Sequence, residues 1–78
     1  MKTIQYTDSG GKRVVAIQDG RICGDAEIIT YDDRQGVREN HFTAAKLLSD
    51  LAGFGRVSFI SKTPDETVWN WKTQSKRA

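Results

Sequence analysis

The chain contains 78 residues, of which 37% are hydrophobic and 28% are charged, and its formal net charge is +2. This length predicts one small domain, and the aromatic and β-branched content is typical of a folded chain rather than a disordered one. No run of about 18 apolar residues is present and the first residues lack the apolar stretch of a signal peptide, so we expect neither a membrane span nor secretion.

The first part of the chain predicts three strands joined by short turns. Residues 2–7 alternate between apolar and polar side chains, which indicates a half-buried strand. Residues 12–18 are rich in β-branched side chains and residues 21–31 continue the pattern, so both are predicted strands. The sequences Asp-Ser-Gly-Gly at residues 8–11 and Asp-Gly at residues 19–20 are typical of the turns between them.

A two-residue turn at Asp19-Gly20 predicts the register of the second and third strands. Gln18 would then oppose Arg21, Ile17 would oppose Ile22, and Val15 would oppose Gly24. One face of the three strands gathers most of the apolar side chains, namely Ile4, Tyr6, Val15, Ile17, Ile22, Ala26 and Ile28. We expect this face to form the core, because a buried face specifies the register of its strands.

The middle of the chain predicts a fourth strand and a helix. After a loop at residues 32–36, Val37–Phe42 would pair with the third strand. Thr43 is a typical helix cap, and a helix is predicted over residues 44–52, ended by Gly53 in the left-handed conformation. Its core stripe would contain Ala44, Leu47, Leu48 and Leu51, while Lys46, Ser49 and Asp50 would face water.

The last part predicts a closing hairpin of residues 56–61 and 67–72. Pairing Ser61 with Thr67 would set Phe59 opposite Trp69 and Val57 opposite Trp71, with all four aromatic and aliphatic side chains on one face. The polar, basic residues 73–78 are expected to fray.

The predicted fold is therefore α+β: an antiparallel sheet, in the order β-β-β-β-α-β-β, with one short helix packed on one face, in a single domain of residues 1–72. Because a helix of this length cannot cover six strands, we expect part of the sheet to stay exposed to solvent or to contact a partner.

Residue types with catalytic or metal-binding chemistry are scarce. Cys23 is the only cysteine, which excludes an intramolecular disulfide and favours a reducing cytoplasm, and His41 is the only histidine. Two such ligands are too few for a zinc site, and the predicted register sets them about 13 Å apart, too far for a catalytic pair. His41 would instead oppose Glu27, as a surface ion pair or a pH-sensitive contact.

The Gly-Gly-Lys sequence at residues 10–12 lacks the spacing of a phosphate-binding loop. With this motif and the Cys and His sites excluded, we expect no metal, no cofactor and no enzymatic activity.

Carboxylates gather on the sheet face opposite the predicted core. The candidate partner-binding residues are Asp25, Glu27, Tyr31, Asp32, Asp33 and Glu39. The same face would carry the apolar side chains of Val14, Ala16, Cys23, Ile29 and Val37, and mixed apolar and charged exposure is typical of an interface. Such a face fits a partner rich in arginine and lysine, for example a nucleic-acid-binding host complex, or a second copy of the chain. A solvated surface is the competing interpretation and the more common one for such a run of charges, with Arg34 and Arg38 diluting the negative charge.

These features favour a non-enzymatic protein-binding module in the cytoplasm that works by occupying the surface of a partner, with a homodimer as one form that it could take. In size and in its motif-free sheet-and-helix outline, the chain resembles small inhibitors that phages and mobile elements encode. Such proteins include blockers of host enzymes and of CRISPR effector complexes. The likeness is one of general outline and implies inhibition by competition for a basic groove.

A small nucleic-acid-binding protein is the alternative function. Residues 43–78 carry a net charge of +3 against −1 for residues 1–42. Aromatic and basic side chains of this half suggest a platform on which bases stack beside a basic tail: Lys62, Trp69, Trp71, Lys72, Lys76 and Arg77. The competing interpretation, which we favour, is that both tryptophans belong to the core under the helix.

Overall fold

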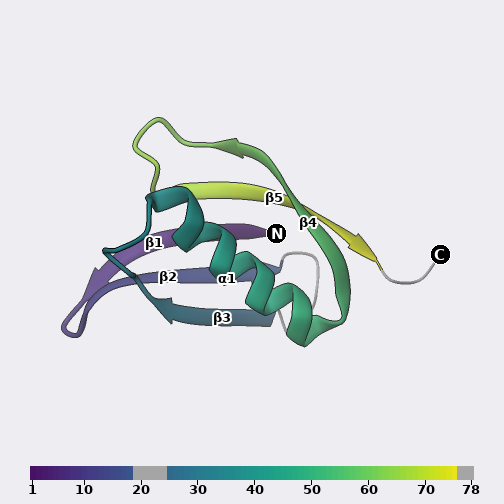
Figure 1. Ribbon diagram of the computed structural model, residues 1–78, viewed down its shortest axis with the longest axis horizontal. Helices are drawn as coiled ribbons and strands as arrows, with labels where there is room; N and C mark the ends of the chain where they lie inside the picture. Colours follow the sequence, from purple (N-terminus) through teal and green to yellow (C-terminus); the bar gives the residue numbers. More distant parts are fainter. Residues whose placement is uncertain (19–24, 76–78) are drawn as a thin grey trace.

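The computed structural model describes residues 1–18 and 25–75 and confirms the predicted α+β class. Five antiparallel strands form one sheet, and a single helix packs on it (Figure 1). In chain order the elements are β1 (Lys2–Asp8), β2 (Gly11–Gln18), β3 (Asp25–Thr30), α1 (Val37–Ala52), β4 (Phe54–Lys62) and β5 (Val68–Ser75). The strand order β3-β2-β1-β5-β4 places the first and last strands side by side at the centre of the sheet.

The first hairpin forms where the glycines predict it. Asp8 pairs with Gly11, which leaves Ser9 and Gly10 as the turn. The Asp8 carboxylate accepts a hydrogen bond from the Gly10 N–H at 2.8 Å. Gly11 has a φ of 114°, a conformation that side chains other than glycine rarely adopt.

The predicted register of β2 and β3 is wrong, although the predicted grouping of side chains is right. Gln18 pairs with Asp25 instead of Arg21, and Ile17 pairs with Ala26 instead of Ile22. The Asp-Gly turn and Ile22 lie outside the described residues. The partner of Ile17 moves by four residues, and an even shift keeps every side chain on its predicted face.

The segment Val37–Phe42 is not a fourth strand but the first part of α1, a helix of 16 residues. Thr43 therefore lies inside the helix, where its hydroxyl donates to the carbonyl oxygen of Glu39 at 2.8 Å. The cap position belongs to Gly36, which has no side chain to offer. The predicted end is confirmed, because Gly53 is left-handed with a φ of 78°.

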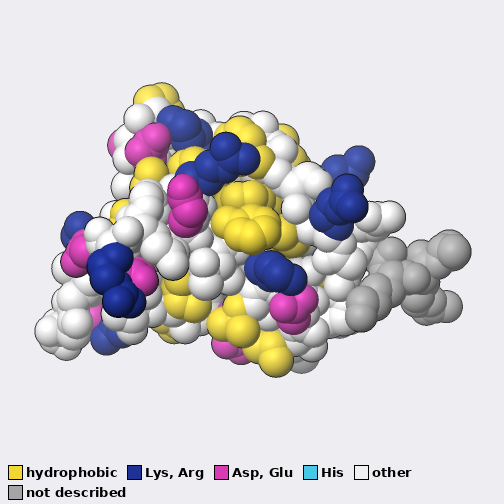
Figure 2. Space-filling model, viewed as in Figure 1, with side chains coloured by type: hydrophobic (Ala, Val, Ile, Leu, Met, Phe, Trp, Pro, Cys, Tyr) yellow, Lys and Arg dark blue, Asp and Glu magenta, His cyan; other side chains and the backbone are white. Residues whose placement is uncertain are grey.

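The helix covers the opposite face of the sheet from the one we expected. Val14 and Ala16 are fully buried beneath α1, whereas Ile28, predicted as core, is 57% exposed. Figure 2 views the molecule with α1 in front and shows hydrophobic side chains at the surface on this side too. Leu47 and Leu51 are among the exposed hydrophobic residues, against the prediction. The buried stripe of the helix consists of Asn40, His41, Ala44, Ala45, Leu48 and Ser49.

Small and polar side chains explain how this stripe packs. Ala44 and Ala45 present only methyl groups, which let the helix backbone approach the sheet closely. Each polar member makes at least one hydrogen bond: the Thr3 hydroxyl lies 2.7 Å from Nδ1 of His41, and the Ser49 hydroxyl donates to the carbonyl oxygen of Gly55 at 2.8 Å. Buried polar groups that are hydrogen-bonded in this way add little cost to burial.

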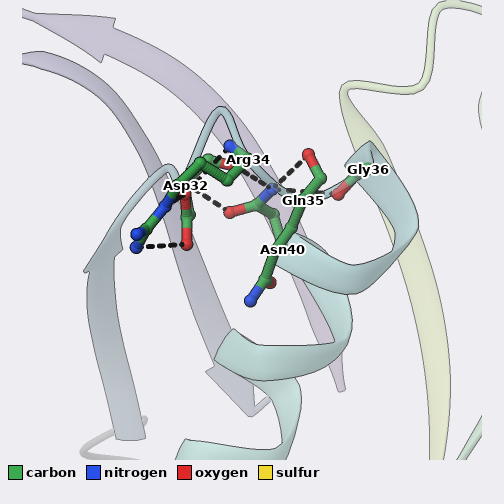
Figure 3. A network of polar contacts seen from close by, with 5 residues as sticks. All are labelled: Asp32, Arg34, Gln35, Gly36 and Asn40. Atoms are coloured by element: carbon green, nitrogen blue, oxygen red, sulfur yellow. Dashed lines mark hydrogen bonds and ion pairs between the residues drawn. The ribbon is translucent and has the colours of Figure 1, made fainter.

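Asn40 organises the connection that leads from β3 into the helix (Figure 3). Its side-chain nitrogen donates to the carbonyl oxygens of Asp32 at 3.0 Å and Gly36 at 2.9 Å. Its side-chain oxygen accepts from the backbone N–H of Asp32 at 2.7 Å. One buried amide thereby satisfies backbone groups on both sides of the turn, so it substitutes for a side-chain cap.

The closing hairpin forms with a register that differs from the prediction by two residues up to Phe59 and by three residues from Ser61 on. Phe59 pairs with Trp71 and Lys62 with Trp69, and the ladder is irregular between Phe59 and Ser61. The predicted common face is kept nonetheless, because the ring of Phe59 lies against the rings of both Trp69 and Trp71. Trp69 and Trp71 are only 4% and 3% exposed. The interpretation of both tryptophans as core residues is confirmed.

We predict that Asn40→Ala lowers the free energy of unfolding by about 2–3 kcal/mol, because the backbone groups of the β3–α1 connection lose their partner while partly buried. Urea unfolding followed by circular dichroism measures this change. The matched control is Glu39→Ala, one residue earlier and exposed, for which we expect a change below about 0.5 kcal/mol. Equal effects of the two substitutions would contradict the assigned role of Asn40.

Candidate interaction surface

The predicted acidic residues are divided between two parts of the molecule. Asp25 begins β3, and Glu27 lies further along that strand, on the side covered by the helix, where it lines a hollow with Leu48 and Leu51. Tyr31, Asp32 and Asp33 follow each other in the β3–α1 connection, and Glu39 lies in the first turn of α1. The face that was predicted to be open between them is the face that α1 covers.

Basic side chains neutralise much of this acidic group. Arg34 contacts the Asp32 carboxylate at 3.1 Å, and this hydrogen-bonded pair lowers the pKa of Asp32. Lys12 lies 3.5 Å from the Asp33 carboxylate and also sits over the ring of Tyr31, 4.9 Å from its centroid. The connection is therefore a mixed polar surface, without the concentrated negative charge that a basic groove would require.

His41 does not pair with Glu27, because the segment that carries it is helical and turns its side chain into the core. The imidazole is fully buried and stacks on Trp69, with the ring centroids 5.3 Å apart. The indole N–H of Trp71 donates to the Thr3 hydroxyl at 2.9 Å, which leaves the hydroxyl proton for Nδ1 of His41. The remaining ring nitrogen, Nε2, is buried without a partner among the described residues.

Burial determines the charge state of this histidine. It lowers the pKa of His41 from the ordinary 6.5 to about 4, because the charged imidazolium loses its hydration, and the Glu66 carboxylate offsets only part of this effect. His41 is therefore neutral in the folded protein near neutral pH, and it links α1 to β1 and β5 as a structural side chain.

The exposed aromatic side chains gather where α1 meets β4 and β5. Phe42 on α1 is 40% exposed and Phe59 on β4 is 43% exposed. Their rings lie 5.8 Å and 5.9 Å from the ring of Trp71, so the buried indole supports both. We call the two phenylalanines the aromatic seam, and Figure 2 shows hydrophobic side chains near the centre of this view, with basic side chains around them.

Charged residues of both signs flank the aromatic seam. Arg38 and Glu39 line an open hollow together with Phe42. On the other side, Lys62 lies 5.9 Å from the ring of Trp69 and pairs with Glu66 at 3.0 Å. An apolar centre within a charged rim is the arrangement found in protein interfaces.

The residues proposed for nucleic-acid binding do not form one surface. The rings of Trp69 and Trp71 are buried, whereas base stacking needs an exposed ring face. Lys72 is exposed, but it alternates with Trp71 along β5 and so projects from the opposite side of the sheet. Lys76 and Arg77 lie outside the described residues.

Sequence reasoning missed Phe42 and Phe59 as candidate surface residues. Phe42 was assigned to a strand and Phe59 to the buried hairpin face. The signal for Phe42 was present in the spacing of residues 40, 41, 44, 45, 48 and 49, a helical stripe on which Phe42 has no place. The stripe begins with Asn40 and His41, which are polar, so its spacing was not recognised as that of a buried helix face.

Within residues 1–18 and 25–75, no three histidine, cysteine, aspartate or glutamate side chains lie together as a metal site would require. In the same ranges, no helix has both the length and the apolar character needed to cross a membrane. Comparison of the chain with protein-family models, curated proteins and solved structures found no match. A function has therefore to be inferred from the residues themselves.

We predict that acid destabilises the protein through His41. In the unfolded chain its pKa returns to about 6.5, so between about pH 6.5 and about pH 4 the unfolded state binds more protons than the folded state. The free energy of unfolding should then fall as the pH falls, with a slope of up to about 1.4 kcal/mol per pH unit. Urea unfolding across this window measures the slope.

His41→Phe is the control, because it keeps an aromatic ring on Trp69 and removes the titrating group. His41 is the only histidine of the chain, so the upper part of the window has no second imidazole. The variant should show a flatter pH dependence above about pH 5, whatever its stability at neutral pH. An unchanged slope would show that His41 is not the group responsible.

Proposed function

We propose that this protein is a non-enzymatic protein-binding module that engages its partner through the aromatic seam. The observation that supports the proposal is the pair of exposed rings, Phe42 and Phe59, held on buried Trp71. Aromatic side chains in such a position supply large apolar contact areas and dominate the energetics of many interfaces.

The seam is built on the packed core of the molecule. Phe59 also contacts Trp69 at 5.1 Å, and Trp69 and Trp71 stack on one another at 6.0 Å. The Thr3 hydroxyl accepts a hydrogen bond from the indole of Trp71, and the ring of His41 stacks on the indole of Trp69. Rings that are ordered before binding lose little conformational entropy when a partner covers them, which favours affinity.

Inhibition is the form of binding that we favour. A chain of 78 residues works most simply by occupying a surface that another molecule needs. The target would be a host enzyme or a CRISPR-type effector complex, as for the small phage-encoded inhibitors that the chain resembles in outline. The charged rim, with Arg38, Glu39, Lys62 and Glu66, would set the orientation of the partner.

Affinity capture of the tagged protein from lysate of cells that naturally express it tests this proposal, with and without nuclease. We expect a stoichiometric protein partner that survives nuclease and whose recovery falls at least about tenfold when Phe42 and Phe59 are both changed to Ser. The matched control is Leu51→Ser, which removes an exposed hydrophobic side chain from the same helix, away from Phe42.

Two results would contradict the proposal. Capture that is unaffected by the double substitution would show that the aromatic seam is not the contact surface. Recovery of RNA or DNA that nuclease abolishes would support the nucleic-acid alternative instead.

A further inference from the structure

The sheet has two edge strands, β4 and β3, and they differ in regularity. The ladder between β4 and β5 has register shifts between Phe54 and Val57 and between Phe59 and Ser61. Bulges of this kind twist an edge strand and discourage a further strand from pairing with it. Strand β3, in contrast, pairs with β2 along its whole length of six residues without a shift, and it contains no proline. It is therefore the edge that accepts another strand more readily.

The backbone groups on the outer side of β3 are free in the single chain. The N–H of Tyr31 donates to the carbonyl oxygen of Lys12 directly opposite. Hydrogen-bonded and non-hydrogen-bonded pairs alternate along an antiparallel ladder. Every second residue of β3, counted back from the residue before Tyr31, therefore directs its N–H and C=O away from β2. These outward residues are Thr30, Ile28 and Ala26.

Nothing in the described part of the chain covers this outer side. Among the described helices and strands, β3 contacts only β2, beside it in the sheet, and α1, which lies over one face (Figure 1). Unpaired backbone groups along a regular edge are a template for pairing with another strand.

We propose that the outer edge of β3 pairs with the same edge of a second copy of the chain, antiparallel, about a two-fold axis that passes through Ile28 perpendicular to the sheet. The two sheets then form one continuous sheet, with both copies of α1 on the same face. The inference is independent of the aromatic seam, because Phe42 and Phe59 lie against Trp71 of β5, away from β3.

The spacing of the outward residues selects this axis. With Ile28 opposite Ile28 of the second copy, Ala26 of each chain opposes Thr30 of the other. All three outward residues then exchange hydrogen bonds with the second copy through both N–H and C=O. A shift by two residues in either direction leaves one of them without an outward residue of β3 opposite. A shift by one residue opposes groups that point away from each other.

The side chains of β3 favour the same register. Glu27 opposes Ile29 of the second copy, so the acidic side chain meets no like charge directly across. A shift by two residues toward the start of the strand would set Glu27 opposite Glu27, which is destabilising. Ile28, which is 57% exposed in the single chain, comes to lie beside Ile28 of the second copy. The strand thus complements itself in the register that forms the most backbone hydrogen bonds, which is why we choose a second copy as the occupant.

The first measurement is the mass of the purified protein by sedimentation over a range of concentrations, up to the solubility limit. We expect a reversible change from the 8.7 kDa chain to twice that mass. Because no other protein is present, the result does not depend on the aromatic seam. A monomer at every concentration would overturn the proposal and leave the proposed function untouched.

Amide hydrogen exchange, followed by NMR, then locates the contact. In the dimer the N–H groups of Ala26, Ile28 and Thr30 should exchange at least about tenfold more slowly than in the monomer, because they gain hydrogen bonds. The N–H groups of Glu27 and Ile29 point toward β2 in both states and serve as internal controls. A dimer in which the three outward amides stay unprotected would use another surface and would overturn the proposal.

A proline substitution tests the backbone contact itself. Ile28→Pro removes an outward N–H without removing a hydrogen bond to β2, and edge strands tolerate proline in this orientation. We expect it to raise the dissociation constant of the dimer at least about tenfold, since the axis uses this N–H in both copies. The matched control is Ile28→Val, which keeps the N–H and a β-branched side chain and should change the constant less than about threefold.

Circular dichroism checks that these variants fold. Ala26→Pro removes an equivalent N–H nearer the start of the strand, and it repeats the test if Ile28→Pro does not fold. A dissociation constant that a folded proline variant leaves unchanged would overturn the proposed pairing of β3.

Discussion

Asn40, His41 and Ser49 lie on the buried stripe of α1, and each is hydrogen-bonded at a different place in the fold. Asn40 holds the connection at the start of the helix, His41 reaches β1 through Thr3, and Ser49 reaches the first residues of β4. A buried polar group without a partner costs more free energy than a single methyl contact gains. Of the three, the contact between His41 and Thr3 exists only when α1 lies over the face that carries Thr3, so it favours that face.

The choice of face explains where the apolar surface of the protein is left exposed. With α1 over Val14 and Ala16, the aliphatic residues on the other side of the same strands stay uncovered, as the 57% exposure of Ile28 shows. The helix also runs beside β4 and β5, so Phe42 and Phe59 share Trp71 at the surface. The packing of α1 on this face of the sheet therefore leaves two separate apolar surfaces exposed, one on each side of the sheet.

Local patterns were reliable where a single strand or turn decides the outcome. The alternation along β1 and β2, the glycines of the first turn, and Gly53 at the end of the helix were all predicted correctly, because each depends on neighbouring residues alone. The register error in β2 and β3 was an even shift, and the odd shift in the closing hairpin occurs only beyond its irregularity at Phe59 and Ser61, so the groups of side chains that share a face survived both errors. The aromatic seam was not predicted, because it requires Phe42 of the helix and Phe59 of β4 to meet over Trp71.

The segment Val37–Phe42 shows why local patterns fail elsewhere. Its valine and phenylalanine favour a strand, and Gly36 offers no capping side chain, so the start of the helix depends on the contacts of Asn40 with the preceding connection. The sequence was enough to establish an α+β sheet with one helix and two alternative apolar faces. Only the tertiary structure decided which face is covered, because that choice depends on which face supplies a partner for the buried His41, and Thr3 does so.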